Sequence, residues 1–156
     1  MDSLTHILNA ETSLKRIVED LDTMPEGQSG ALLLIDIDKF KLINDNYGHL
    51  EGDSILKQFA LLLRDSFRSE DIVGRPGGDE FIVYMKAVND RKILHDKCNA
   101  LCHAASQILI NGQKSITISV GAALATRGQS YSELYQKADS ALYLAKEHGR
   151  NRFEIA

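Results

Sequence analysis

The segment Pro76-Gly77-Gly78-Asp79 constrains the fold of this chain more than any other, because it joins two short runs that have the composition of strands. The first run covers residues 71–74 and the second covers residues 81–85. Glycine adopts positive φ angles without steric cost, and a tight hairpin turn requires such angles. The sequence therefore predicts an antiparallel hairpin with acidic residues at its tip.

Apolar spacing predicts the other elements. Helical periodicity favours helices over residues 10–24, 40–47, 55–67, 93–109 and 134–145, the first with Asn9 as its N-cap and the last ended by Gly149. Continuous or alternating apolar runs favour further strands over residues 31–35, 116–120 and 153–155. This order of elements predicts an α+β fold with a central mixed, largely antiparallel five-stranded sheet flanked by helices.

Composition limits the domain count and the partners. A chain of 156 residues is close to one domain of about 150, so we expect residues 1–156 to form a single unit. With 18 basic against 22 acidic residues the net charge is −4, which argues against a general nucleic-acid partner. The longest apolar runs are far shorter than the roughly 20 residues of a membrane span, so we expect no membrane contact by this domain. The first residues do not resemble a signal peptide, which favours the cytoplasm.

Two acidic pairs follow predicted strands, namely Asp36 with Asp38, and Asp79 with Glu80. Magnesium prefers hard oxygen ligands and is usually held by one or two carboxylates together with substrate phosphates. The two pairs therefore suggest a shared Mg²⁺ site for a nucleotide. Taken one at a time, however, acidic residues at strand ends more often serve as turn or capping residues.

A phosphate group would have to be bound without a P-loop, because the chain has no match to that motif. Lys41 follows the first acidic pair, and Lys146 and Arg150 lie four residues apart near the end of the last helix. These three cations are the candidate phosphate ligands, although an isolated lysine on a helix usually belongs to a solvated face.

Read together, the motifs resemble the GGDEF family of diguanylate cyclases, which is named after the sequence found here at residues 77–81. Further matches occur in the family's order along nearly the whole chain. They are Asp2-Ser3-Leu4-Thr5 with Asn9, residues 36–45, Tyr47-Gly48-His49 with Gly52-Asp53, Ser119-Val120-Gly121, residues 138–146, and Gly149-Arg150-Asn151-Arg152.

The resemblance implies a fold related to nucleotidyl cyclases and polymerase palms, with a ferredoxin-like core. It also implies that two GTP molecules are condensed into cyclic di-GMP with release of two pyrophosphates, across a homodimer in which each domain holds one GTP. By position, Asp36, the Ile37 carbonyl, Asp79 and Glu80 would bind Mg²⁺, with Mn²⁺ as a possible substitute.

The same resemblance assigns roles to the remaining candidates. Asp79 would accept the proton of the attacking hydroxyl, with Glu80 beside it, and Lys41 would stabilise charge on the phosphates in the transition state. Lys146 and Arg150 would bind the phosphates as well.

The guanine base would be bound by Asn44 and Asp53, and His49 matches a further substrate position. A carboxylate at Asp53 accepts from two guanine donors that adenine lacks, which favours GTP over ATP. The alternative is that Asp53 caps a helix that starts near Ser54.

Arg68-Ser69-Glu70-Asp71 has the R-x-x-D form and the spacing from Gly77 that mark the family's product-inhibition site. The motif alone is weak evidence for such a site, since Arg and Asp three residues apart are common at helix ends.

Three residues depart from the family pattern: His6 replaces a glycine, Ala10 replaces an arginine, and Pro76 precedes the two glycines.

These observations lead us to expect a diguanylate cyclase domain from a longer signalling protein with an upstream sensor or dimerisation element. The main rival is a catalytically silent module that binds GTP or cyclic di-GMP. A cyclase that makes mixed cyclic dinucleotides is a third reading, against which Asp53 argues.

Overall fold

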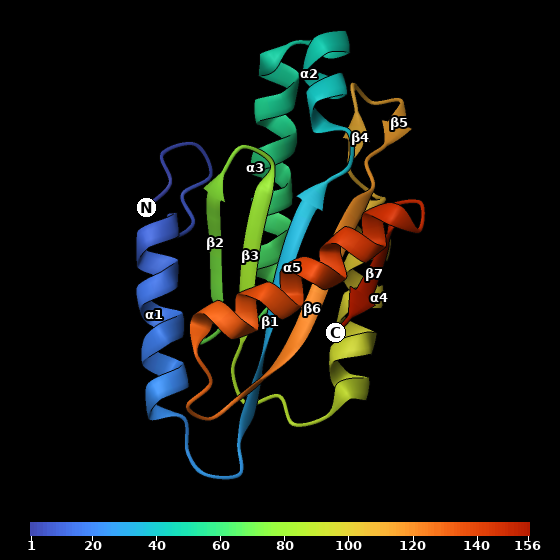
Figure 1. The fold of residues 1–156 in the computed structure, drawn as a ribbon. Coiled ribbons are helices and arrows are strands. Elements are labelled where there is room, and N and C mark those ends of the chain that lie inside the picture. The colour runs from blue at the N-terminus through green and yellow to red at the C-terminus, as the bar shows by residue number, and fades with distance from the viewer.

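The computed structural model describes all residues from 1 to 156, and helices and strands are mixed along the chain (Figure 1). The helices are α1 (Ala10–Thr23), α2 (Phe40–Tyr47), α3 (His49–Ser66), α4 (Arg91–Ala105) and α5 (Tyr131–Glu147). The strands are β1 (Ser29–Ile37), β2 (Ile72–Gly77), β3 (Glu80–Met85), β4 (Leu109–Ile110), β5 (Lys114–Ser115), β6 (Ile118–Thr126) and β7 (Arg152–Ile155). No helix is both long enough and apolar enough to cross a membrane.

A five-stranded sheet in the order β2-β3-β1-β6-β7 forms the centre of the molecule. Neighbouring strands are antiparallel except β6 and β7, which α5 connects as a parallel pair. Helices α1 and α5 cover one face of this sheet, while α3 and α4 cover the other (Figure 1). The α+β fold with a mixed, largely antiparallel sheet is thus confirmed.

Side-chain alternation along β1 determines which groups reach each face. Leu33 and Ile35 pack into the core beneath α3 and α4, whereas Leu32 and Leu34 pack against α1 and α5. Because successive side chains of a strand point to opposite faces, Asp36 lies on the face that α5 covers. The strand predicted over residues 31–35 is confirmed and is buried on both faces, and it extends to Ile37 and therefore includes Asp36.

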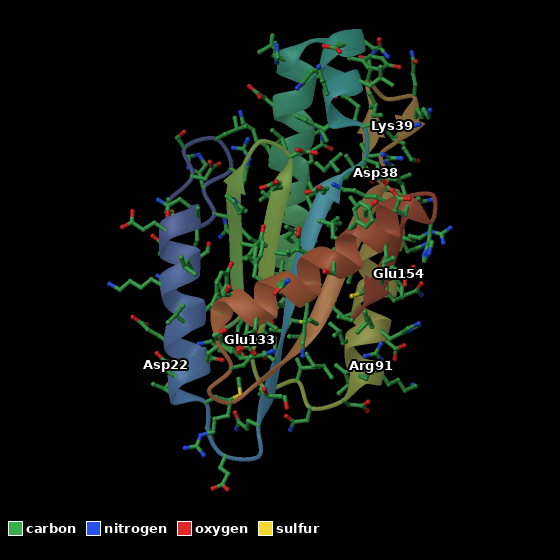
Figure 2. All side chains as sticks on the ribbon, in the orientation of Figure 1. Asp22, Asp38, Lys39, Arg91, Glu133 and Glu154 are labelled. Carbon is green, nitrogen blue, oxygen red and sulfur yellow. The ribbon has the colours of Figure 1, made fainter.

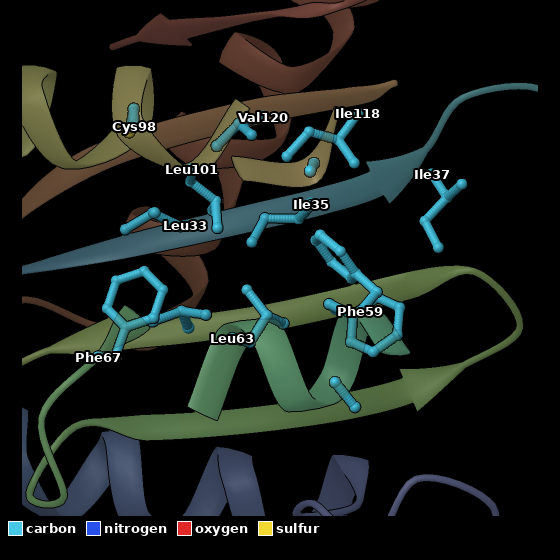
Figure 3. Packing of buried hydrophobic residues seen from close by; sticks show 14 of the residues in the cluster. Leu33, Ile35, Ile37, Phe59, Leu63, Phe67, Cys98, Leu101, Ile118 and Val120 are labelled. Atoms are coloured by element: carbon cyan, nitrogen blue, oxygen red, sulfur yellow. The ribbon is translucent and has the colours of Figure 1, made fainter. Parts of the chain in front are cut away.

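The larger core lies between the sheet and helices α3 and α4 (Figure 3). Phe59 of α3 packs edge-to-face against Phe81 of β3, with ring centroids 4.9 Å apart. Leu101 of α4 lies in the same cluster. This packing fixes the position of β3, and with it the position of the hairpin tip.

Glycine allows α5 to approach the sheet closely. A Cβ atom added at Gly121 of β6 would lie 2.6 Å from the Cα of Leu142 and would also overlap the carbonyl oxygen of Ala138. Both clashes are with the backbone of α5, which cannot move aside without losing its packing. The absence of a side chain at Gly121 therefore allows α5, which carries Lys146 in its last turn, to lie close against the sheet.

The C-terminal strand is held by α4. Arg91, at the start of α4, donates from Nη1 to the Ala156 carbonyl at 2.9 Å and from Nη2 to the Ile155 carbonyl at 3.1 Å. Figure 2 labels Arg91 and, on β7, Glu154. These bonds tie the end of the chain to the α4 side of the sheet.

Several boundaries differ from the sequence prediction, most clearly those of α4 and β6. Helix α4 ends at Ala105, so Ile108 and Leu109 lie beyond it, and Leu109 begins the small hairpin β4-β5, which was not predicted. Strand β6 begins at Ile118 and continues to Thr126. Its second half is rich in glycine and alanine, and it is a strand because β1 pairs with it as far as Thr126, whereas β7 pairs only with Ser119–Ala122.

Candidate active site

The predicted hairpin is confirmed, and its tip is a two-residue turn. Gly77 pairs with Glu80, and Gly78 and Asp79 lie between them, with Gly78 at a φ of 54°. The register shifts between Gly74 and Gly77, so the segment that contains Pro76 does not pair with β3. This is where the missing N–H of a proline costs least.

Arg75 connects the hairpin turn to the N-terminal segment of the chain. Arg75 donates from Nε at 2.9 Å and from Nη2 at 2.8 Å to the Gly78 carbonyl, and its Nη1 lies 3.1 Å from each carboxylate oxygen of Asp2. Asp2 in turn accepts from the backbone N–H and the hydroxyl of Thr5. Although burial acts in the opposite direction, the bonds from Thr5 and Arg75 lower the pKa of Asp2.

The N-terminal turn that contains Asp2 also explains one departure from the family pattern. His6 has a φ of 61°, in the left-handed region, where glycine is the residue without steric cost. Arg75 itself was not among the predicted site residues. Its position two residues before the double glycine is the sequence feature that could have identified it as a residue that contacts the turn.

Three of the predicted carboxylates lie on adjacent segments at the hairpin, although no three acidic side chains form a ready-made metal-ligand cluster. Asp36 of β1 lies directly opposite Glu80 of β3 in the antiparallel register. The backbone N–H of Ile37 donates to the Asp79 carbonyl at 3.4 Å, which brings the end of β1 against the turn. The site is therefore formed by two adjacent strands and the turn that follows one of them.

The carboxylates affect one another's protonation. Burial, followed by the charge of Asp36, raises the pKa of Asp79 above its usual value. The pKa of Glu80 is raised by burial, by Asp36 and Asp79, and less strongly by Asp139 of α5, which was not predicted as a site residue. Lys146 acts in the opposite direction on both groups and is ion-paired with Asp36. The site thus carries an excess of negative charge.

Asp38 does not join this cluster, and the initial pairing of Asp36 with Asp38 as ion ligands is wrong. Its buried carboxylate accepts from the hydroxyls of Thr117 and Ser119, both at 2.6 Å, and from the Asn151 N–H at 3.0 Å (Figure 2). Asp38 therefore links the end of β1 to the segment before β6 and to the loop before β7.

The predicted phosphate ligands lie around the end of β1. Lys41 is exposed in the first turn of α2, and Lys146 contacts Asp36. Arg150, at a φ of 63°, lines a separate cavity of about 320 Å³ together with Lys39 and Lys114. The structure thus brings Lys146 to the carboxylates and leaves Arg150 in a separate cavity, on the loop that Asp38 holds.

The predicted base ligands lie where α2 meets α3. The Asn44 Oδ1 atom is buried without a hydrogen-bond partner, and a Cβ added at Gly52 would overlap it. Helix α3 begins at His49, so Asp53 lies inside the helix and the reading of Asp53 as an N-cap is wrong. Asn44 and the half-buried Asp53 are therefore two acceptors at one helix junction, and His49 is exposed at the start of α3.

The R-x-x-D motif lies at the other end of β2. The Arg68 side chain is 56% exposed, whereas the Asp71 side chain is only 1% exposed. The Asp71 carboxylate accepts from the backbone N–H groups of Arg68 and Lys86, both at 3.0 Å. The two residues of the motif thus differ in accessibility: the arginine faces solvent and the aspartate fixes the local backbone.

These features define a class of protein: a mixed sheet that carries an acidic site on two adjacent antiparallel strands, with cations supplied by a helix. The family described as "Diguanylate cyclase, GGDEF domain" matches residues 1–152. The chain belongs to this family.

Relatives and solved structures agree with this assignment. Diguanylate cyclase DosC of Escherichia coli (strain K12) is 37% identical over 161 residues, covering 99% of this chain and 35% of that protein. Diguanylate cyclase DgcS of Shewanella oneidensis is 38% identical over 129 residues, covering 82% of this chain and 43% of that protein. The chain thus spans about a third to two fifths of the length of these relatives.

Two solved structures have the same fold. Diguanylate cyclase SiaD from Pseudomonas aeruginosa, in complex with its activator SiaC, superimposes with a TM-score of 0.91 at 30% identity, covering 99% of this chain and 61% of that chain. The coiled coil and GGDEF domain of DgcB from Caulobacter crescentus, in complex with c-di-GMP, gives a TM-score of 0.87 at 26% identity, covering 100% of this chain and 85% of that chain. The predicted cyclase-like and palm-like fold is confirmed.

Proposed function

We propose that this chain is the catalytic domain of a diguanylate cyclase, which condenses two GTP molecules into cyclic di-GMP and two pyrophosphates. The observation that carries the proposal is the register of β1 and β3, in which Asp36 faces Glu80 beside Asp79 and is paired with Lys146. The family and the curated relatives support the same reaction class.

The acidic cluster suits a divalent cation. After burial, the charge of Asp36 raises the pKa of both Asp79 and Glu80, and Lys146 is the cation that partly compensates this charge. Asp36, the Ile37 carbonyl, Asp79 and Glu80 would hold Mg²⁺ or Mn²⁺, with the remaining ligands supplied by nucleotide phosphates. Such an ion, when bound, would polarise the phosphoryl oxygens.

The protein groups then divide the chemistry among them. The 3′-hydroxyl of one GTP would lose its proton to the Asp79 carboxylate while its oxygen bonds to the α-phosphorus of the other GTP, and the bond to pyrophosphate breaks. Burial and Asp36 raise the pKa of Asp79, which makes this carboxylate a stronger base. Lys41, Lys146 and Arg150 would stabilise the negative charge on the phosphates.

Guanine recognition is assigned to the α2–α3 junction. The buried, unpaired Oδ1 of Asn44 would accept from a donor on the base, and Asp53 would accept from the guanine N1–H and exocyclic amine. A buried acceptor without a partner costs about 1–3 kcal/mol, so a base that satisfies it is favoured over one that does not. This arrangement favours GTP over ATP, and His49 would add a further contact.

Each chain would hold one GTP, so the active form would be a homodimer in which two sites face each other. We also propose that residues 1–156 are one domain of a longer cytoplasmic signalling protein, since the relatives are two to three times as long. Cyclic di-GMP would inhibit the enzyme at Arg68 and Asp71.

A silent module that binds GTP or cyclic di-GMP is the alternative, and turnover distinguishes the two. The protein would be incubated with GTP and Mg²⁺ at low and high concentration, with products identified by mass spectrometry. We expect cyclic di-GMP that rises faster than linearly with protein concentration and is lost in Asp79→Asn. Asp65→Asn, at an exposed position on α3, is the matched control and should retain activity. If the protein binds GTP but forms no cyclic di-GMP at any protein concentration, the cyclase proposal is refuted and the silent binding module is favoured.

A further inference from the structure

A cavity of about 270 Å³ lies on the face of the sheet that α1 and α5 cover, next to the proposed metal site. Figure 1 shows that these two helices run at an angle to each other over this face. The cavity is lined by residues of both helices and of β1, β2 and β3, and most of them are hydrophobic. Ligand pockets usually measure about 300 Å³ or more, so this cavity suits a small organic ligand.

Part of the cavity wall is aromatic and aliphatic. Tyr131 and Tyr135 lie one turn apart on α5, with ring centroids 5.8 Å apart. Leu14 of α1 lines the same cavity, and both Leu14 and Tyr135 are exposed to solvent. A flat apolar ring bound in the cavity would remove these surfaces from water.

The charge of the cavity is negative. Three acidic residues, Asp36, Glu80 and Asp139, line it, and Lys146 is its one basic group. Lys146 is paired with Asp36, whereas neither Glu80 nor Asp139 forms an ion pair. Asp139 follows Tyr135 by four residues, so the two side chains lie on the same side of α5. A cation in the cavity would thus meet two unpaired carboxylates and an aromatic ring, both of which attract positive charge.

Two of the three residues that depart from the family pattern line this cavity. They are Ala10, at the start of α1, and Pro76 of β2. An arginine at position 10 would extend into the cavity and place its guanidinium group near the carboxylates. Because this chain has an alanine there, both the space and the negative charge are left for a ligand.

We infer that this cavity binds a small aromatic cation of the aromatic monoamine class, with its ring against Leu14 and the two tyrosines and its ammonium group at Glu80 and Asp139. The inference goes beyond the proposed reaction, since neither GTP nor cyclic di-GMP carries a positive charge. It rests on the proposed function in one respect, because Asp36 and Glu80 also belong to the proposed metal site. The ligand and a divalent cation would repel each other there, so the ligand would act as an inhibitor.

Direct binding tests this site without turnover. Tryptamine, an indole that carries an ammonium group, would be titrated into the isotope-labelled chain in the absence of divalent cations and followed by NMR. We expect saturable shifts of the amide resonances of cavity residues. Indole-3-acetate has a similar ring and the opposite charge. It should bind at least about tenfold more weakly, since a hydrogen bond to a charged group corresponds to roughly a tenfold change in affinity or more.

Two variants test the residues of the cavity. Ala10→Arg occupies the space and supplies the cation, so tryptamine should bind at least about tenfold more weakly. Asp139→Asn removes one carboxylate and should weaken binding by roughly fivefold or more. Glu19→Gln and Glu133→Gln, on the same two helices but outside the cavity, change the net charge by the same amount and should bind within about twofold of wild type. The dispersion of the NMR spectrum verifies that every variant is folded.

Saturable tryptamine binding that weakens in both cavity variants and in neither control supports the site. Absence of binding by the wild type would overturn it, as would equal affinity for indole-3-acetate or wild-type affinity in either cavity variant. Saturating Mg²⁺ should weaken tryptamine binding by the wild type. If Mg²⁺ leaves that affinity unchanged while both cavity variants bind weakly, the proposed metal site is contradicted and the cavity site is still supported.

Discussion

Replacement of Asp38 by alanine tests whether this residue is structural, as the geometry indicates, or a member of the metal site. The substitution removes the acceptor of three hydrogen bonds, from Thr117, Ser119 and Asn151. Hydrogen bonds to a charged group contribute about 1.5–3 kcal/mol each. Thr117 and Asn151 lie where water can replace the carboxylate, whereas the Ser119 side chain is fully buried and would remain unsatisfied.

The free energy of unfolding should therefore fall by about 3–5 kcal/mol, which is less than the sum of the three bonds because two donors regain water. For a chain of this size each kcal/mol lowers the melting temperature by about 2–4 °C, so a decrease of roughly 6–20 °C is expected. Urea denaturation in the absence of divalent cations measures the change directly.

Asp36→Asn is the matched control, two residues earlier and inside β1. It weakens the ion pair with Lys146 but also relieves the repulsion from Asp79 and Glu80, so the free energy of unfolding should change by no more than about 1 kcal/mol. A loss below about 1 kcal/mol in Asp38→Ala, or an equal loss in both variants, would refute the structural assignment of Asp38.

Three further predictions concern other parts of the chain. Gly52→Ala should displace the Asn44 side chain that an added Cβ overlaps and weaken GTP binding by roughly tenfold, as measured by calorimetry; unchanged affinity would contradict a base site there. Burial raises the pKa of Cys98 to about 12 and that of Cys102 to about 11, so both thiols should react slowly with a disulfide reagent at pH 8 until urea unfolds the protein. The folded state keeps these protons above pH 9 while the unfolded state releases them, so stability should fall as the pH rises past 9. Asp79→Asn should raise the melting temperature at pH 7 without divalent cations, because the raised pKa of Asp79 means that its charge destabilises the fold; this gain should decrease as the pH falls through the raised pKa and disappear only well below pH 3.8, where the carboxyl is protonated in both states.

Local sequence patterns were sufficient to predict most of the elements, because the hairpin glycines, the Asn9 cap and the apolar spacing all act within a few residues. Asn9 does cap α1, accepting from the Thr12 N–H at 2.9 Å. The missed hairpin β4-β5 carried a local signal as well, since Asn111 and Gly112 both have positive φ angles and an Asn-Gly pair is typical of tight hairpins.

The errors arose where distant parts of the chain decide the outcome. Asp38 has the same local context as Asp36, but its partners Thr117, Ser119 and Asn151 are 79, 81 and 113 residues away in sequence. Strand alternation places Asp36 on the α5 face and could be read from the sequence. The hydrogen bonds that Asp38 accepts from Thr117, Ser119 and Asn151 could not. The second half of β6 was missed for a similar reason. Its alanines have a low preference for strands, and it forms one because it pairs with the distant strand β1.

The contacts from Asp2 through Arg75 to Gly78 connect the N-terminal turn to the hairpin turn between β2 and β3. Both side chains are shielded, with Arg75 only 12% and Asp2 only 17% exposed, so salt in the medium would weaken the connection little. A displacement of Asp2 would therefore act, through a single arginine, on the Gly78 carbonyl, one residue before the proposed proton acceptor Asp79.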